Sequence, residues 1–288
     1  MEFSGMYRLA EAYFRLQPKR SEEEYDAWLK KQKGKREKRG LPPGDMGARR
    51  VTGPGDLFFI HEAPDSPCAV FYCHGGSYIH DFSLFHWRFL RKLTERTGAT
   101  VIAAGYRLAP YGDWSDAFGL ILPEYVRYAK EYPEKKLVLM GDSAGGGLAA
   151  ALALELNRLG ARAPDELILL SPWMDVTLSD PDISAFVPRD PWLTPSLRSC
   201  GRWWAGAADT QDPRVSPLYG PVEGLRRVTV FAGTWEILNP DSVQLFKRLD
   251  PRSDSELVVG EGMFHVYPLL PIPEARPAVD RIVEKMLR

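Results

Sequence analysis

The chain has 288 residues, with 37 basic and 38 acidic side chains and a formal charge of −1. Such a balance argues against a protein built to bind nucleic acid along its whole surface. A hydrophobic fraction of 44% and a charged fraction of 26% are typical of a soluble globular protein and exclude a disordered or fibrous one. No apolar run approaches the roughly 18 residues that a membrane helix needs. The N-terminus lacks the pattern of a signal peptide. Because the three cysteines are an odd and sparse set, we expect a reducing, cytoplasmic location.

Residues 1–50 differ in character from the rest and predict two amphipathic helices. Apolar residues recur at helical spacing in the first of them, at Met6, Leu9, Ala10, Tyr13 and Leu16. Ser21 and Glu24 form the pattern of a capping box for the second, whose apolar stripe would be Tyr25, Trp28 and Leu29. A basic run follows at 30–39. It indicates either an anionic partner or a solvated helix end, and the balanced charge of the chain favours the solvated end.

After residue 55 the sequence alternates between strand and helix patterns. Buried strands are predicted at 68–73, 100–104, 137–140, 167–170, 228–232 and 257–259. Helices are predicted at 83–97, 113–131, 144–159, 239–249 and 274–287, with Pro123 expected to kink or shorten the second of these. This alternation predicts an α/β protein with a mostly parallel sheet covered on both faces. A stretch at about 178–215 breaks the rhythm and is typical of a lid or binding loop.

The sequence Gly-Asp-Ser-Ala-Gly at 141–145 follows a predicted strand and opens a predicted helix. A serine at such a turn is a nucleophile elbow, where glycines two residues before and after it avoid collisions of side chains. The rival interpretation is a dinucleotide-binding loop at 145–150. Two sheet strands precede this loop, and the nearest acidic residue of the required kind, Asp175, lies too far along the chain. A nucleophilic serine, Ser143, is therefore the favoured interpretation.

Acyl transfer also needs an oxyanion hole, a base and an acid. The sequence His-Gly-Gly-Ser at 74–77 follows a buried strand and can expose backbone N–H groups. We expect the donors to be Gly75, Gly76 and Ala144. His265 is the one histidine that follows Ser143 in the sequence, which predicts it as the base. Glu236, after the strand at 228–232, is the expected acid, with Asp241 as the alternative.

Several separate motifs occur together in the right order: His74-Gly75-Gly76, Tyr106-Arg107-Leu108-Ala109-Pro110, Gly141-Asp142-Ser143-Ala144-Gly145-Gly146, Ser171-Pro172-Trp173, Asp175, Ser216-Pro217-Leu218-Tyr219-Gly220 and His265-Val266. In these motifs the chain resembles the hormone-sensitive-lipase-like carboxylesterases of the α/β-hydrolases. The resemblance implies a three-layer sandwich with an eight-stranded, mostly parallel sheet. It also implies a cap made from the N-terminal helices and the later insertion. The chain departs from the family at Ser77, where a glycine is usual, and at Glu236, where an aspartate is usual.

These observations predict a serine carboxylesterase that hydrolyses short- to medium-chain acyl esters through Ser143, His265 and Glu236. The expected substrate is a small-molecule ester, with no cofactor, metal, nucleic-acid partner or membrane span, and a homodimer is possible. Residues 1–50 would form a cap segment and 51–288 the catalytic domain. Candidate pocket residues are Phe14, Ser77, Tyr78, Trp192, Trp203 and Trp204, although the aromatic ones could equally form the core of the cap. A hydrolase-fold binding protein without activity, or a peptidase or amidase using the same triad, remain alternatives.

Overall fold

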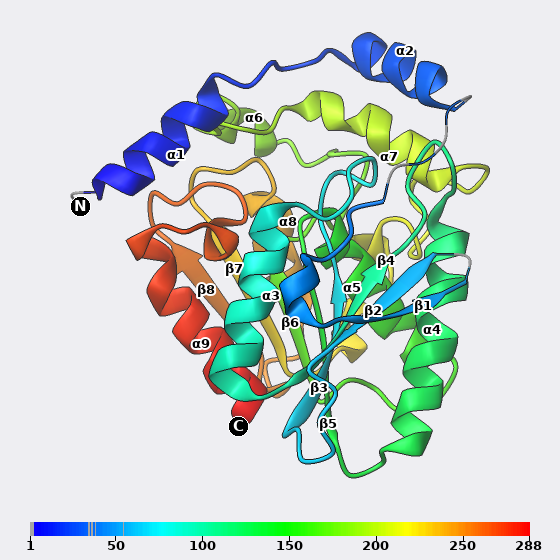
Figure 1. Ribbon diagram of the computed structural model, residues 1–288. Coiled ribbons are helices and arrows are strands. Elements are labelled where there is room, and N and C mark those ends of the chain that lie inside the picture. Colours follow the sequence, from blue (N-terminus) through cyan, green and yellow to red (C-terminus); the bar gives the residue numbers. More distant parts are fainter. Residues whose placement is uncertain (1–2, 34, 36, 38, 54) are drawn as a thin grey trace.

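An eight-stranded sheet forms the centre of the computed structural model, which describes residues 3–33, 35, 37, 39–53 and 55–288 (Figure 1). The strand order is β1-β2-β4-β3-β5-β6-β7-β8. Strands β1 and β2 are antiparallel to their neighbours, whereas all pairs from β4 to β8 are parallel. The strands are β1 Arg49–Thr52, β2 Asp56–Ile60, β3 Cys68–Cys73, β4 Thr100–Gly105, β5 Lys136–Asp142, β6 Glu166–Leu170, β7 Val228–Gly233 and β8 Glu256–Gly260.

The six strands expected from buried apolar runs are all confirmed, and the two antiparallel ones were missed. Strand β1 is exposed at all four residues, and its sequence, Arg-Arg-Val-Thr, carries no apolar run. Strand β2 is fully buried, and the run Leu57-Phe58-Phe59-Ile60 is the signal that could have revealed it. The ion pair between Arg50 and Asp56, with 2.8 Å between guanidinium nitrogen and carboxylate oxygen, joins the two strands near their turn.

Helices cover both faces of the sheet and give the expected three layers. One face packs against α4, α5 and α8, and the opposite face packs against α3 and α9. The bounds of these helices are α3 Leu84–Thr97, α4 Trp114–Glu131, α5 Ala144–Arg158, α8 Asn239–Arg248 and α9 Arg276–Leu287. Pro123, which we expected to kink or shorten its helix, does not shorten it, since α4 continues through the proline to Glu131. Buried residues on both sides of the proline, Ile121 and Tyr125 among them, hold the helix against the sheet.

A cap lies over the C-terminal ends of the parallel strands (Figure 1). It consists of α1 Gly5–Arg15 and α2 Glu22–Gln32 together with the short helices α6 Ile183–Phe186 and α7 Arg198–Ala205. The predicted capping box of Ser21 and Glu24 is present at the start of α2. Helices α2 and α7 are joined through Asp26, whose carboxylate accepts hydrogen bonds from Ser199 Oγ and from Trp203 Nε1 at 2.9 Å.

Helix α1 buries only one edge of its apolar side, and most of the residues that predicted the helix lie on the exposed edge. Tyr7 and Phe14 are its buried residues. Met6, Leu9, Tyr13 and Leu16, which belong to the apolar spacing that predicted the helix, are all exposed. Apolar spacing located the helix but could not show which part of its wide apolar side would meet the protein.

Candidate active site

Ser143 stands at the sharp turn between β5 and α5. Its backbone has φ 53° and ψ −123°, a left-handed conformation that is costly for a residue other than glycine. A Cβ atom at Gly141 would overlap the carbonyl oxygen of Gly145, and one at Gly145 would overlap the carbonyl oxygen of Cys73. Only glycine therefore fits two residues before and two residues after the serine. The turn places Ser143 at the N-terminus of α5, where the helix dipole favours negative charge.

Ser143, His265 and Glu236 form a continuous hydrogen-bonded chain. Ser143 Oγ lies 2.8 Å from Nε2 of His265, and Nδ1 of His265 lies 2.7 Å from Oε2 of Glu236. The other carboxylate oxygen of Glu236 accepts a hydrogen bond of 2.7 Å from the backbone N–H of Gly233. Their exposed fractions are 7% for Ser143, 2% for His265 and 0% for Glu236. Both carboxylate oxygens of Glu236 are therefore held by hydrogen bonds, and the side chain can orient the imidazole in an environment that largely excludes water.

The alternative acid, Asp241, lies away from the histidine in a buried site of its own. Its Oδ2 accepts backbone N–H groups from Met174 at 3.3 Å and from Asp175 at 3.0 Å. Burial, followed by the negative charge of Asp175, raises the pKa of Asp241 to about 8. Asp241 therefore joins α8 to the loop after β6 and makes no contact with the triad chain.

The loop at 74–77 corrects one expectation about the oxyanion donors. The backbone N–H of Gly75 donates to Oδ1 of Asp142 at 2.9 Å, so this donor is already used. Gly76 and Ser77 line the cavity beside Ser143, and within the described residues their N–H groups have no protein acceptor. Ser77 has φ 56° and therefore keeps the left-handed backbone that usually favours glycine. Ala144 is the first residue of α5, where a helical N–H has no acceptor of its own.

Asp142, the residue before the serine, is a member of the site that sequence reasoning did not single out. It accepts hydrogen bonds from the Tyr72 hydroxyl at 2.6 Å and from Gly75, and its Oδ2 lies 3.3 Å from Nε2 of His86. Burial acts to raise the pKa of Asp142, but His86 and these hydrogen bonds hold it below its ordinary value. The carboxylate thus ties the oxyanion loop to the elbow. The sequence signal was its position inside the elbow motif.

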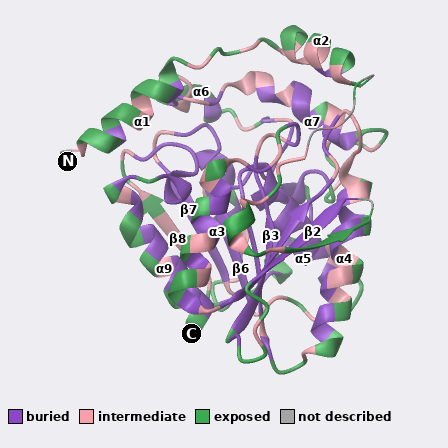
Figure 2. Cartoon of the chain, in the orientation of Figure 1, coloured by how far each residue is buried: buried purple, intermediate pink, exposed green. Residues whose placement is uncertain are grey.

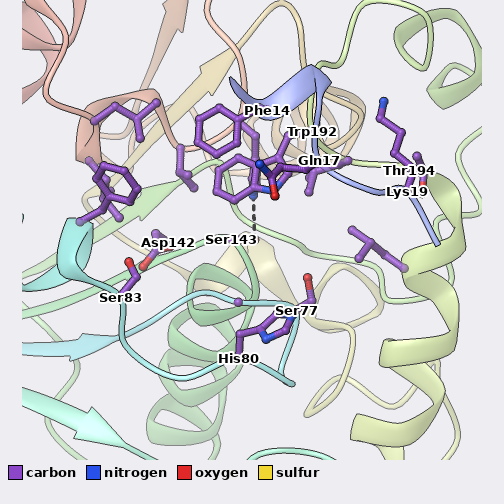
Figure 3. A pocket seen from close by; sticks show the side chains of 18 of the residues that line it. Phe14, Gln17, Lys19, Ser77, His80, Ser83, Asp142, Ser143, Trp192 and Thr194 are labelled. Atoms are coloured by element: carbon purple, nitrogen blue, oxygen red, sulfur yellow. Dashed lines mark hydrogen bonds between the residues drawn. The ribbon is translucent and has the colours of Figure 1, made fainter. Parts of the chain in front are cut away.

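A cavity of about 580 Å³ opens directly onto Ser143 and His265. Figure 3 shows Phe14, Gln17 and Trp192 on the cap side of this cavity, with Ser77 and His80 across from them. Ser83 and Asp142 lie on one side of Ser143, and Lys19 and Thr194 lie on the other. Lining residues therefore lie on more than one side of the serine.

Three of the candidate pocket residues do not line this cavity, whereas Phe14, Ser77 and Trp192 do. Tyr78 and Trp204 are each 1% exposed, and their rings stack on each other with centroids 4.1 Å apart. Trp203 is used by the contact between α7 and α2 through its hydrogen bond to Asp26. Tyr78 and Trp204 therefore belong to the core under the cap, where each ring is buried against the other, and Trp203 belongs to the contact between two cap helices.

The cap reaches the histidine through a chain of aromatic contacts and one buried carboxylate. Phe14 stacks on Trp192 with ring centroids 4.1 Å apart, and Trp192 meets the edge of His265 at 5.6 Å. Asp190 accepts the backbone N–H groups of Trp192 and Leu193 at 2.8 Å and that of Ile237, next to the triad glutamate, at 2.9 Å. Burial raises the pKa of Asp190. One side chain thus joins the insertion to the loop after β7.

Membrane-spanning helices and metal-binding clusters bear on the expected partners, and both concern the described residues alone. No helix in this part of the chain is long and apolar enough to cross a membrane. Within the same residues, no cluster of three or more histidine, cysteine, aspartate or glutamate side chains could hold a metal ion.

Comparison with known proteins gives the family. A family profile described as "alpha/beta hydrolase fold" matches residues 70–269. An esterase of Acinetobacter venetianus is 31% identical over 222 residues, which cover 75% of this chain and 73% of the esterase. LipR of Mycobacterium tuberculosis, which bears the name of an acetyl-hydrolase, is 35% identical, and the match spans 54% of this chain but only 51% of LipR.

Solved structures agree with this assignment. A crystal structure of an esterase from the bacterial hormone-sensitive lipase family has a TM-score of 0.81 and 26% sequence identity. The match covers 100% of this chain and 99% of that one. The protein therefore belongs to the α/β-hydrolase family, in its hormone-sensitive-lipase-like branch, as the motifs predicted.

Proposed function

We propose that the protein is a serine carboxylesterase that hydrolyses short- to medium-chain acyl esters. The observation that carries this proposal is the hydrogen-bonded chain from Ser143 through His265 to Glu236, buried at the floor of a cavity of about 580 Å³. A cavity of this size is in the range of small-molecule sites. Esters are also the substrates that the names of the relatives indicate, since these are an esterase and an acetyl-hydrolase.

In the first half of the reaction, Ser143 Oγ attacks the carbonyl carbon of the ester while Nε2 of His265 takes the hydroxyl proton. The carbonyl oxygen becomes an oxyanion, and the N–H groups of Gly76, Ser77 and Ala144 are its proposed donors. Glu236 accepts the Nδ1–H of His265 and stabilises the imidazolium that forms. The C–O bond to the alcohol then breaks, and the imidazolium returns its proton to the leaving oxygen.

The second half of the reaction repeats the first with water as the nucleophile. His265 takes a proton from water, the resulting hydroxide attacks the acyl-enzyme, and Ser143 leaves with the proton from the imidazolium. We assign to α1, α2 and the insertion the role of a cap that sets acyl length and excludes water, because Phe14 and Trp192 close the cavity above the serine. The exposed donor at Ser77 carries a side chain into the same cavity and would limit the space for the acyl group.

The decisive experiment combines one variant with a substrate panel. Ser143→Ala should fold normally, lose at least about 10³-fold in kcat on p-nitrophenyl butyrate and no longer react with a fluorophosphonate probe. The matched control is Ser184→Ala, an exposed serine on α6 whose hydroxyl only bonds the neighbouring carbonyl of Pro181. Retention of activity by Ser143→Ala would refute the assignment.

The same panel separates the two alternatives. Cleavage of a peptide p-nitroanilide in preference to the esters would indicate a peptidase or amidase. A wild-type protein that neither cleaves any of these substrates nor reacts with the probe would be a binding protein. A series of esters from acetate to octanoate measures the acyl-length preference and so tests the role assigned to the cap.

A further inference from the structure

Helix α1 has an apolar side about twice as wide as the protein covers. At 3.6 residues per turn, its apolar residues spread over roughly half of the helix circumference. One edge of this arc carries Tyr7 and Phe14, which pack against Phe264, the residue before His265. Their ring centroids lie 5.3 and 5.6 Å from that of Phe264. The other edge faces solvent, with exposed fractions of 50% for Met6, 74% for Leu9, 56% for Tyr13 and 83% for Leu16. We call these four residues the outer stripe.

The helix is held firmly in this orientation, so the exposure is built into the fold. The hydroxyl of Tyr7 donates to the carbonyl oxygen of Gly262 at 2.5 Å. At the start of α1, Ser4 gives its N–H and its hydroxyl to the two carboxylate oxygens of Glu274, at 2.6 and 2.9 Å. A rotation that buried the outer stripe would break these contacts and expose Tyr7. Four large apolar side chains on one helix edge therefore remain in water unless something outside the chain covers them.

The segment that carries the outer stripe is also the basic part of the molecule. Residues 1–40 contain eleven basic and seven acidic side chains, although the whole chain has a charge of −1. Beyond α1, four lysines at the end of α2 and just after it are exposed: Lys30, Lys31, Lys33 and Lys35. None of these four forms an ion pair with any of the described residues. Helices α1 and α2 run along the same end of the molecule, and both show exposed residues on their outer side (Figure 2).

The outer stripe also adjoins the cavity. Tyr13 is 56% exposed and at the same time lines the cavity above Ser143. The lining continues along the chain from Phe14 through Gln17, Pro18 and Lys19 to Arg20, toward the basic segment. The mouth of the active site therefore opens at the edge of a surface that is both apolar and basic.

A second copy of the chain is a poor occupant for this surface. The stripe presents four side chains, three of them on α1, a helix of 11 residues about 16 Å long, and Leu16 directly after it. A stable dimer buries roughly 800 Å² on each partner, far more than one helix edge supplies. Two basic segments facing each other would also repel. An anionic lipid layer has neither defect, since apolar side chains enter it at its surface and lysines attract its head groups.

We propose that the protein docks on anionic lipid surfaces through this face. Helix α1 lies flat in the lipid–water boundary with Met6, Leu9 and Leu16 among the acyl chains, and the lysines after α2 contact the phosphate groups. The mouth of the cavity then faces the lipid layer. The docking follows from the exposed stripe and from the positive charge of the four lysines. It does not depend on the hydrolytic activity.

Sedimentation with vesicles tests the proposal. The wild-type protein should bind phosphatidylcholine vesicles that contain phosphatidylglycerol and bind pure phosphatidylcholine vesicles much more weakly. The double variant Leu9→Glu, Leu16→Glu should lower the partition coefficient at least about tenfold. Replacing the four lysines by glutamine should remove the preference for the anionic vesicles and the sensitivity to salt. Both variants should keep the wild-type circular dichroism spectrum and Tm, because all six side chains are exposed.

The matched control is Leu159→Glu, Leu287→Glu, since these leucines are 54% and 50% exposed but lie at the C-terminal ends of α5 and α9, away from the cap. This control should bind vesicles like the wild type. The proposal is overturned if the wild type does not bind anionic vesicles, or if the control and the α1 variant lose binding equally. It is equally overturned if a dimer forms without vesicles and the α1 variant dissociates it, since the stripe is then an interface between copies.

Discussion

The loops that carry the proposed triad of Ser143, His265 and Glu236 and the cap above them are held in place by different means. Each triad side chain sits directly after a sheet strand or in the loop beyond it, and strand pairing fixes its position. Ser143, Glu236 and His265 are at most 7% exposed. The cap instead is held by side-chain contacts between segments far apart in the sequence, such as Tyr7 with Gly262 and Asp26 with Trp203. Changes in the loops should therefore affect the chemistry, whereas changes in the cap should affect substrate choice and leave the chemistry intact.

The largest effect should come from the acid in the loop after β7. Glu236→Gln should lower kcat by about 10² to 10⁴, because an amide can present the wrong atom to Nδ1 of His265 and cannot stabilise the imidazolium. Asp241→Asn is the matched control, since it also replaces a buried carboxyl group near the same strand. It should leave kcat within about twofold. The reverse ranking, measured on p-nitrophenyl butyrate, would transfer the role of the acid to Asp241.

A substitution of Asp190, which connects the cap insertion to the loop after β7, should have an intermediate effect. Asp190 accepts N–H groups from both the insertion and the loop after β7, so Asp190→Asn turns one acceptor toward them into a donor. We expect kcat/KM to fall about tenfold. Both a lower kcat and a higher KM should contribute, because Trp192 and the neighbour of Glu236 shift together. Asp182→Asn, an exposed aspartate of the same insertion, should behave as wild type. Identical kinetics for the two variants would show that Asp190 does not couple the insertion to the loop that carries Glu236.

A change confined to the cap should be smaller still and should appear in KM. Phe14→Ala removes the ring that stacks on Trp192 and opens the cavity. We expect KM for butyrate esters to rise about fivefold while kcat stays within about twofold, and the preference to shift toward longer acyl chains. Leu9→Ala on the same helix, at a side chain that is 74% exposed, is the control. A loss of kcat equal to the rise in KM would show that α1 also orients the catalytic histidine.

The smallest effect concerns stability rather than activity. The pKa of Asp241 is raised to about 8 by burial and by Asp175, so the folded protein keeps a proton that the unfolded chain releases near pH 4. The stabilisation from this proton is complete at pH values below the unfolded pKa and is lost as the pH rises through about 8.

Denaturation in urea at about pH 5 and about pH 9 would measure this loss. Between these values the free energy of unfolding of the wild type should fall relative to that of Asp241→Asn by about 1 kcal/mol or more, because the amide does not titrate. Equal pH dependence in the two proteins would show that Asp241 titrates normally in the folded state.

The parts of the site that could be predicted are those whose chemistry dictates local sequence. The elbow needs glycine at 141 and 145 because any side chain there would meet backbone oxygen. His265 and Glu236 were predicted from their order after buried strands, with Asp241 left as the alternative acid, and the structure places His265 within hydrogen-bond distance of both Glu236 and Ser143. Of the three predicted oxyanion donors, the structure speaks against Gly75, while Gly76 and Ala144 stay predictions. The sequence showed which loop supplies N–H groups but could not show that Asp142 already uses the one at Gly75.

By itself, the sequence determined the parallel strands, the helices between them and the residues that meet at their C-terminal ends, because buried runs and tight turns leave few local alternatives. Only the tertiary structure decided which aromatic residues line the cavity and which support the cap, since Trp192 and Trp204 belong to the same insertion but meet different neighbours. It also decided that Leu9 and Leu16 face solvent while Phe14 covers the serine. An apolar side chain is drawn to any apolar surface, so its partner depends on which surfaces the folded chain brings within reach.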